Sequence, residues 1–248
     1  MHNIKLIIAY DGGAYLGWQK TNMGPSIEQT LQKAIEKNLQ HPVVLQAASR
    51  TDAGVHANEQ VVNFFSSKSQ IDLHRLKFSL NQLLPKDIVV LSSEFAPSFF
   101  HPTLDCQYKE YRYYICTGSI QLPIHRFYSW HIYQPLDLQK IQHALPYFIG
   151  KKCFAAFSNS KNIPQNINQT REIIKMECLE LENHRLCFKI EGKSFLRNMV
   201  RIIVGTLIDI GKEKISPDNI SGIFESKKRN KAGLTAPAHG LFLHRIIY

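Results

Sequence analysis

The densest cluster of chemically capable side chains in the sequence is Ser49-Arg50-Thr51-Asp52-Ala53-Gly54-Val55-His56. It lies between two predicted strands, where a loop can hold side chains over a sheet. We expect Asp52 to stay ionised, because the nearby Arg50 cation stabilises a carboxylate. Such a carboxylate can act as a nucleophile or a base. The alternative is an ordinary hairpin, in which Asp52 caps its own turn and Arg50 is solvated.

A metal site is the second chemistry that this cluster allows. Asp52 and His56 stand four residues apart, a spacing that would place both on one face of a helix. Gly54 and the strand context disfavour a helix, and two candidate ligands without a clear third make a weak zinc site. We therefore predict no metal at this cluster.

A glycine-rich segment, Tyr10–Gln19, follows the first predicted strand. It lacks the G-x-G-x-x-G spacing of a dinucleotide-binding loop and the lysine of a P-loop. The sequence favours a tight turn with a packed Trp18 over a phosphate-binding loop.

Aromatic and cationic residues alternate along Lys109-Glu110-Tyr111-Arg112-Tyr113-Tyr114. On a strand, alternation puts Tyr111 and Tyr113 on one face and Arg112 and Tyr114 on the other. An exposed tyrosine could stack on a nucleobase, and the arginine could reach a phosphate. Burial in the core is the alternative, which is favoured for Tyr113 and Tyr114 and stays open for Tyr111.

Two basic segments lie near the end of the chain. Arg197 and Arg201 fall one turn apart in a predicted helix and would share a face. They form either a solvated basic face or, for one of them, an inward pair with a carboxylate such as Asp52. Lys227, Lys228 and Arg229 form a basic loop that is suited to phosphate binding.

The charge balance also indicates an anionic partner. Thirty Lys and Arg face twenty Asp and Glu, a net charge of +10. Residues 193–248 alone hold 10 basic and 4 acidic side chains. A polyanion is the natural partner of such a field, and an anionic membrane surface is the second choice.

The compartment follows from what the sequence lacks. No apolar run approaches the roughly 20 residues that a membrane span needs, and the first ten residues lack a signal-peptide cleavage site. The five cysteines contain no C-x-x-C pair, which fits neither a disulfide framework nor a zinc site. We expect a protein of the reducing cytoplasm.

Hydrophobic periodicity predicts the elements that must position these residues. The first half has strands near 4–10, 43–48, 60–65 and 88–95, a helix after its N-cap Ser26, and a helix over 73–84. The second half has strands near 104–116, 172–182, 186–191 and 241–248, and helices near 138–148 and 194–210. Irregular segments cover 117–136 and 151–170, and a short helix and loop cover 215–240.

The predicted order in each half is β-α-β-β-α-β, so we expect an α+β protein with two ferredoxin-like or RRM-like halves, 1–100 and 101–248. The first half carries the Asp52 loop, and the second carries the basic helix and the C-terminal strand.

Five strings together resemble a known family, the bacterial tRNA pseudouridine synthase A family, over essentially the whole chain. They occur in the expected order: Tyr10–Gln19, Ser49–Ala57, Lys109–Tyr114, Lys193–Arg201 and Thr235–Leu243. Two positions depart from the family pattern. Ser49 stands where glycine is common, and Ala238 stands where a second proline is common.

The resemblance implies the pseudouridine synthase fold, with a continuous, mainly antiparallel sheet and helices packed on one side. It implies conversion of uridine to pseudouridine at positions 38, 39 and 40 of the tRNA anticodon stem-loop, a homodimer and no cofactor. Asp52 matches the catalytic aspartate, and Arg50 matches an arginine implicated in base flipping. Tyr111 matches the tyrosine that stacks on the target base, and Arg201 the basic residue that pairs with the aspartate.

The residues agree with this chemistry. The isomerisation needs a carboxylate, cations and an aromatic wall for the extruded base, and it needs no redox carrier. A non-catalytic RNA-binding module would explain the charge and the tyrosines but not Asp52. A metal-dependent hydrolase would explain Asp52 and His56 but not the strand of aromatic and basic residues.

Overall fold

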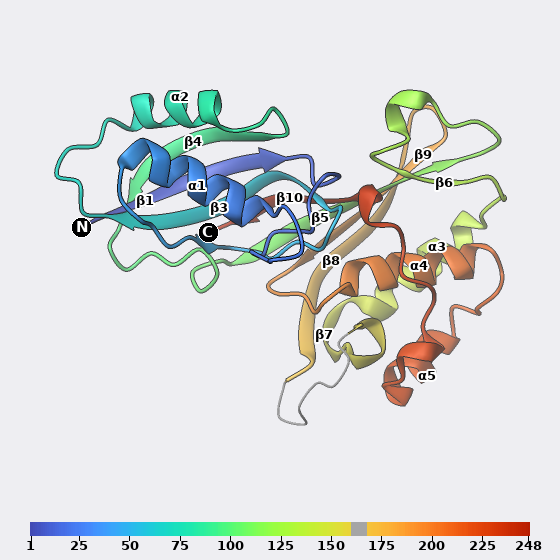
Figure 1. Cartoon of the computed structure of the whole chain (residues 1–248). Coiled ribbons are helices and arrows are strands. Elements are labelled where there is room, and N and C mark those ends of the chain that lie inside the picture. The colour runs from blue at the N-terminus through green and yellow to red at the C-terminus, as the bar shows by residue number, and fades with distance from the viewer. Residues whose placement is uncertain (160–167) are drawn as a thin grey trace. The chain divides into compact units, whose positions relative to one another are not determined.

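The computed structural model describes residues 1–159 and 168–248, which form two compact units (Figure 1). The first consists of Met1–Gln107 and Phe242–Tyr248, and the second of Tyr108–Leu241. The sequence predicts a boundary at residue 100, with the last residues of the chain in the second half. In the structure these last residues cluster with the first unit, because Phe242 and Leu243 of β10 (Leu241–Ile247) lie beside β3 (His56–Ser66) in parallel register.

The strands of the first unit are mainly antiparallel. β1 (His2–Tyr10) pairs with both β3 and β4 (Ile88–Ala96), and the short β2 (Gln46–Ala47) pairs with β3. The side chains of Ile4, Leu6 and Ile8 alternate along β1 and are fully buried, as expected for a strand with one face against a core. The strand predicted over 43–48 is reduced to two residues.

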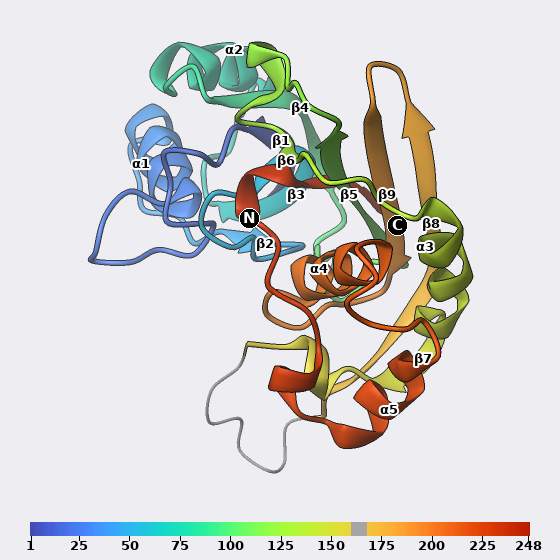
Figure 2. The same cartoon turned by 90° about the vertical axis from the view of Figure 1, so that its right-hand side faces the viewer.

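Two helices cover one face of these strands (Figures 1 and 2). α1 (Ile27–Leu39) begins where the Ser26 side chain accepts a hydrogen bond from the Gln29 amide, so the predicted N-cap is confirmed. α2 (Leu73–Leu83) is capped by Asp72 in the same way and ends ahead of Pro85. The predicted β-α-β-β-α-β order of this half is therefore confirmed.

The strands of the second unit are arranged around β5. β5 (Tyr108–Thr117) lies between β6 (Trp130–Ile132), to which it is parallel, and the antiparallel β9 (Arg185–Gly192). β8 (Thr170–Leu181) and β7 (Gly150–Cys153) continue the antiparallel pairing. Of the segment 151–170, which was predicted to be irregular, residues 160–167 lie outside the described residues.

Helices pack against these strands. α3 (Leu138–Ala144) contacts β8, and α4 (Met199–Gly211) contacts β5 and α3. α5 (Asn219–Ser226) follows, and single 3₁₀ turns cover Pro123–His125, Leu145–Phe148, Ala155–Phe157, Arg229–Lys231 and Ala238–Gly240. The α+β class is confirmed.

The start of α4 corrects one prediction. The helix was expected to begin at residue 194, but it begins at Met199, because Asn198 adopts a left-handed backbone with φ of 59°. Arg197 therefore precedes the helix and shares no helical face with Arg201.

Among the helices described here, none combines the length and the apolar character that a membrane crossing requires.

Candidate active site

Asp52 lies in the turn between β2 and β3, on a loop that spans Ser49–Val55 (the Asp52 loop). The Val55 amide donates to the Asp52 carbonyl at 3.2 Å, and Gly54 adopts a positive φ of 76°. This is the tight turn that the glycine predicted. The Asp52 side chain is half-buried, whereas Arg50 is exposed, so the loop presents a carboxylate and a cation two residues apart.

The residues Asp11–Trp18 (the glycine loop) pack directly against the Asp52 loop. The Trp18 amide donates to the Thr51 carbonyl at 3.0 Å, and the Gly54 amide donates to the Tyr15 carbonyl at 3.3 Å. The Trp18 side chain is only 2% exposed. The predicted tight turn with a packed tryptophan is confirmed.

His56 is buried at the start of β3, where three segments meet. Its Nδ1 atom lies 3.0 Å from Oδ1 of Asp11 and 3.1 Å from the Gly12 amide nitrogen. The ring stacks on Phe242 at a centroid distance of 4.6 Å. Since Nδ1 can donate to the carboxylate or accept from the amide but cannot do both at once, the two contacts compete for one atom.

The hydrolase alternative needs a metal at this point. Within residues 1–159 and 168–248, no three His, Cys, Asp or Glu side chains gather in a way that could hold a metal ion. His56 contacts the glycine loop, so the structure explains this histidine without a metal.

Tyr111 lies on β5 and is 6% exposed. Its ring meets the Phe195 ring edge-on at 5.0 Å. Tyr113, on the same strand face, is fully buried and donates from its hydroxyl to the Pro237 carbonyl at 2.8 Å. Burial raises the pKa of Tyr113, so this phenol stays neutral. The core interpretation of Tyr113 is confirmed.

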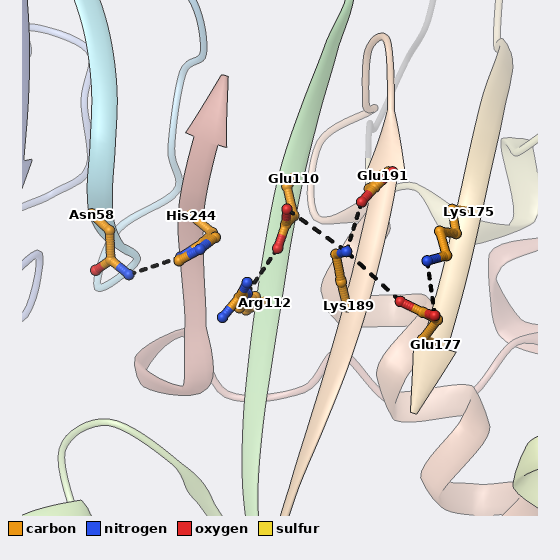
Figure 3. A network of polar contacts seen from close by, with 8 residues as sticks. All are labelled: Asn58, Glu110, Arg112, Lys175, Glu177, Lys189, Glu191 and His244. Atoms are coloured by element: carbon orange, nitrogen blue, oxygen red, sulfur yellow. Dashed lines mark hydrogen bonds and ion pairs between the residues drawn. The ribbon is translucent and has the colours of Figure 1, made fainter. Parts of the chain in front are cut away.

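The opposite face of β5 carries an ion-pair network across three strands (Figure 3). The fully buried Glu110 accepts from Arg112 Nε at 2.8 Å and lies 4.0 Å from Lys189 on β9. Lys189 also approaches Glu191 at 2.9 Å and Glu177 on β8 at 3.7 Å. Burial alone would lower the pKa of Arg112, but its hydrogen bond to Glu110 raises it. Arg112 is thus held against the sheet, which disfavours a contact between this arginine and a phosphate.

Arg201 lies in the first turn of α4 and is half-buried. Its Nε donates to the Ala236 carbonyl at 2.7 Å, and the Ala236 amide donates back to the Arg201 carbonyl at 3.1 Å. Burial lowers the pKa of His239, and the nearby Arg201 charge acts in the same direction. The Arg201 side chain is therefore aligned along the segment 236–239, while Arg197 is exposed.

The predicted basic loop divides into two kinds of residue. Lys227 and Lys228 are exposed. Arg229 instead donates to Asn159 Oδ1 at 2.8 Å, to Thr235 Oγ1 at 2.9 Å and to the Gly233 carbonyl at 2.8 Å. Burial lowers its pKa. Arg229 therefore joins its own segment to Asn159 and to residues 233–235 of the second unit.

Comparison with known proteins gives the same assignment along the whole chain. A family model described as tRNA pseudouridine synthase matches residues 6–108 and 144–248. The chain is 55% identical over 251 residues to tRNA pseudouridine synthase A 2 of Protochlamydia amoebophila, covering 100% of this chain and 95% of that protein. It is 42% identical over 248 residues to tRNA pseudouridine synthase A of Acetivibrio thermocellus, and both chains are covered in full.

The chain belongs to the tRNA pseudouridine synthase family. It is an isomerase that converts uridine to pseudouridine in tRNA, as the resemblance predicted.

Within this synthase, several supporting residues had no sequence signal. Asn159 donates to Asn198 Oδ1 at 3.1 Å and to Thr235 Oγ1 at 3.0 Å, and it accepts from Arg229. The single hint was Thr235, which belongs to one of the five family strings. The sequence pattern suggests His56 only as a metal ligand, because its contact with Gly12 joins residues 44 positions apart.

Proposed function

We propose that this pseudouridine synthase acts on uridines 38, 39 and 40 of the tRNA anticodon stem-loop, with Asp52 as its catalytic carboxylate. The observation that carries the proposal is the Asp52 loop itself. This loop presents a half-buried carboxylate on a tight turn, and backbone hydrogen bonds hold the turn in place. Similarity to synthase A proteins over the full chain supports the choice of substrate.

The reaction balances without an added reagent. The N1–C1′ bond of uridine breaks, the uracil turns, and a C5–C1′ bond forms while the C5 proton leaves and N1 gains one. Asp52 acts as nucleophile or base in this sequence. No electrons enter or leave, so we expect no cofactor, and turnover should persist when a chelator is added.

The other site residues are proposed to contact the RNA or to support Asp52. Arg50 is exposed and carries the base-flipping role, because the target uridine must be extruded from its stack to reach the active site. Tyr111 stacks on the extruded uracil, and Arg201 supports the charge of the aspartate. Arg197, Lys227 and Lys228 are exposed cations that suit phosphates. For Arg229 the hydrogen bonds favour a supporting role inside the protein. The active species is a cytoplasmic homodimer.

The test is replacement of Asp52 in an assay on anticodon stem-loop transcripts. Asp52→Asn and Asp52→Ala are expected to abolish pseudouridine while tRNA affinity stays within a few-fold, because a carboxylate adds no attraction toward phosphates. Losing an essential covalent catalyst can cost many orders of magnitude in rate. The matched control is Glu59→Gln, which removes an exposed carboxylate from β3 and should keep full turnover.

Two results would contradict the proposal. Measurable product from Asp52→Ala at positions 38–40 would exclude the catalytic assignment. Pseudouridine mapped outside positions 38–40 by the parent enzyme would exclude the proposed substrate positions.

A further inference from the structure

The backbone amides of the glycine loop are already used inside the protein. The amide of Gly12 donates to His56, that of Gly13 to Asp11 Oδ1 at 2.8 Å, and that of Tyr15 to the Gly12 carbonyl at 3.0 Å. Those of Leu16 and Trp18 donate to the carbonyls of Pro25 and Thr51. A phosphate-binding loop presents several amides outward toward the anion, so these amides do not suit one.

The same loop touches the Asp52 loop along its length. The Tyr10 hydroxyl, one residue before the glycine loop, lies 2.8 Å from Thr51 Oγ1. A Cβ at Gly12 would lie 2.0 Å from the Val55 carbonyl oxygen, and one at Gly17 would lie 2.7 Å from the Thr51 carbonyl oxygen. Gly17 also has a φ of 95°. Glycine is required at both positions for the backbones to approach this closely.

We propose that the glycine loop is the support that holds the Asp52 loop in its catalytic position, with His56 as the positioning residue that joins the two. This rests on the proposed function, because the support serves Asp52. His56 directly follows the Asp52 turn, and its Nδ1 contacts Asp11 and Gly12 of the supporting loop. Stacking on Phe242 fixes the plane of the ring.

The effect on the reaction follows from geometry. A misplacement of a reacting group by about 1 Å can lower a rate by about 100-fold without weakening binding. Loss of Nδ1 removes the acceptor of the Gly12 amide and the neighbour of the Asp11 carboxylate. The two loops can then separate, which moves Asp52 and leaves the exposed cations Arg197, Lys227 and Lys228 unchanged.

The decisive variants are His56→Phe and His56→Asn. Phenylalanine keeps a ring to stack on Phe242 and removes Nδ1, while asparagine places an amide near the position of Nδ1 that can donate or accept. We expect His56→Phe to lower the single-turnover rate at saturating enzyme at least about 10-fold. The tRNA Kd and its salt dependence should stay those of the parent. His56→Asn should recover most of the rate.

Each alternative predicts a different result. An unchanged rate in His56→Phe would overturn the positioning role. A weaker Kd and a smaller salt slope with a normal saturated rate would overturn it too, since they would identify a phosphate-binding loop. Equal rate losses in the Phe and Asn variants would show that a polar group in place of Nδ1 does not restore the rate, and would also contradict the proposal.

Two further measurements keep the test valid if His56→Phe does not fold or if the proposed function is wrong. If His56→Phe does not fold, Tyr10→Phe removes the hydroxyl contact with Thr51 and should lower the single-turnover rate about threefold or more, well within the effect of a shifted reacting group. A parental rate in that variant would overturn the support. Turnover by Asp52→Ala in the same assay would instead refute the proposed function, which separates the two failures.

Discussion

At the scale of single residues, Tyr111 shows how one side chain can be both core and candidate stacking surface. It is 6% exposed and packs edge-on against Phe195. Stacking requires a face of the ring to become accessible when RNA binds, and a ring held rigidly by its neighbours would then lose little entropy. The structure therefore changes what a truncation at this position should do.

We expect Tyr111→Ala to lose turnover. We also expect its free energy of unfolding to fall by roughly 3–5 kcal/mol, the usual cost of removing an aromatic side chain from a core. Tyr111→Phe keeps the ring, so stability and tRNA affinity should survive, and any fall in kcat would report the hydroxyl. Thermal melts and single-turnover rates measure the two effects. Tyr113→Phe is the control: it removes the bond to the Pro237 carbonyl, costs about 1 kcal/mol and should leave turnover intact. Normal turnover by folded Tyr111→Ala would exclude a stacking role.

At the scale of elements, α4 and the segment after α5 are built to lie close together. The Gly233 amide donates to Thr206 Oγ1 at 2.9 Å, and Ala236 exchanges hydrogen bonds with Arg201. A Cβ at Gly205 would lie 1.9 Å from the Leu234 carbonyl oxygen. The segment that holds Arg201 can approach α4 this closely because residue 205 of the helix is glycine.

Two glycine substitutions test this packing. Gly205→Ala should destabilise the protein by roughly 1–3 kcal/mol, the usual cost of overpacking. Gly222 lies in α5, where an added Cβ would meet no described neighbour within 4 Å, so Gly222→Ala should stabilise by about 0.5–1 kcal/mol. Denaturant unfolding measures both. Equal effects in the two variants would show that helix propensity, rather than the close approach, governs Gly205.

The basic loop makes a second prediction at this scale. Lys227→Ala with Lys228→Ala should raise KM with little change in kcat and should lower the log–log salt slope of tRNA binding by about 0.7–0.9 per lost phosphate contact. Lys33 and Lys37, which are exposed on α1, provide the control, because their replacement removes the same charge. A slope that falls equally in both pairs would indicate a general charge effect.

Arg229→Ala should instead lower the melting temperature, since it removes three hydrogen bonds inside the protein.

At the scale of the whole molecule, the five cysteines are all thiols, and four of them are buried. Burial raises the pKa of Cys187 to about 11 and that of Cys178 to about 12. Thiols in this state are poor nucleophiles, because the thiolate is the reactive form. The folded protein should therefore behave as an almost thiol-inert molecule.

We expect one thiol per chain, the half-buried Cys153, to react quickly with DTNB, and the other four only after unfolding in guanidinium. Cys153→Ser should remove the fast phase. A fast phase that persists in that variant would mean that a buried cysteine becomes accessible through local opening.

Much of this protein can be predicted from local sequence. Ser26 marks a helix start because an N-cap needs only its own next turn, and alternation along Lys109–Tyr114 assigns faces because strand geometry is local. The five strings likewise predict the family. Only the tertiary structure decided which side chains are supports. His56 meets Gly12 across 44 residues, Arg229 meets Asn159 across 70, and the left-handed backbone at Asn198 delays the start of α4 to Met199. Such partners depend on contacts between distant segments, which periodicity and spacing along the chain do not encode.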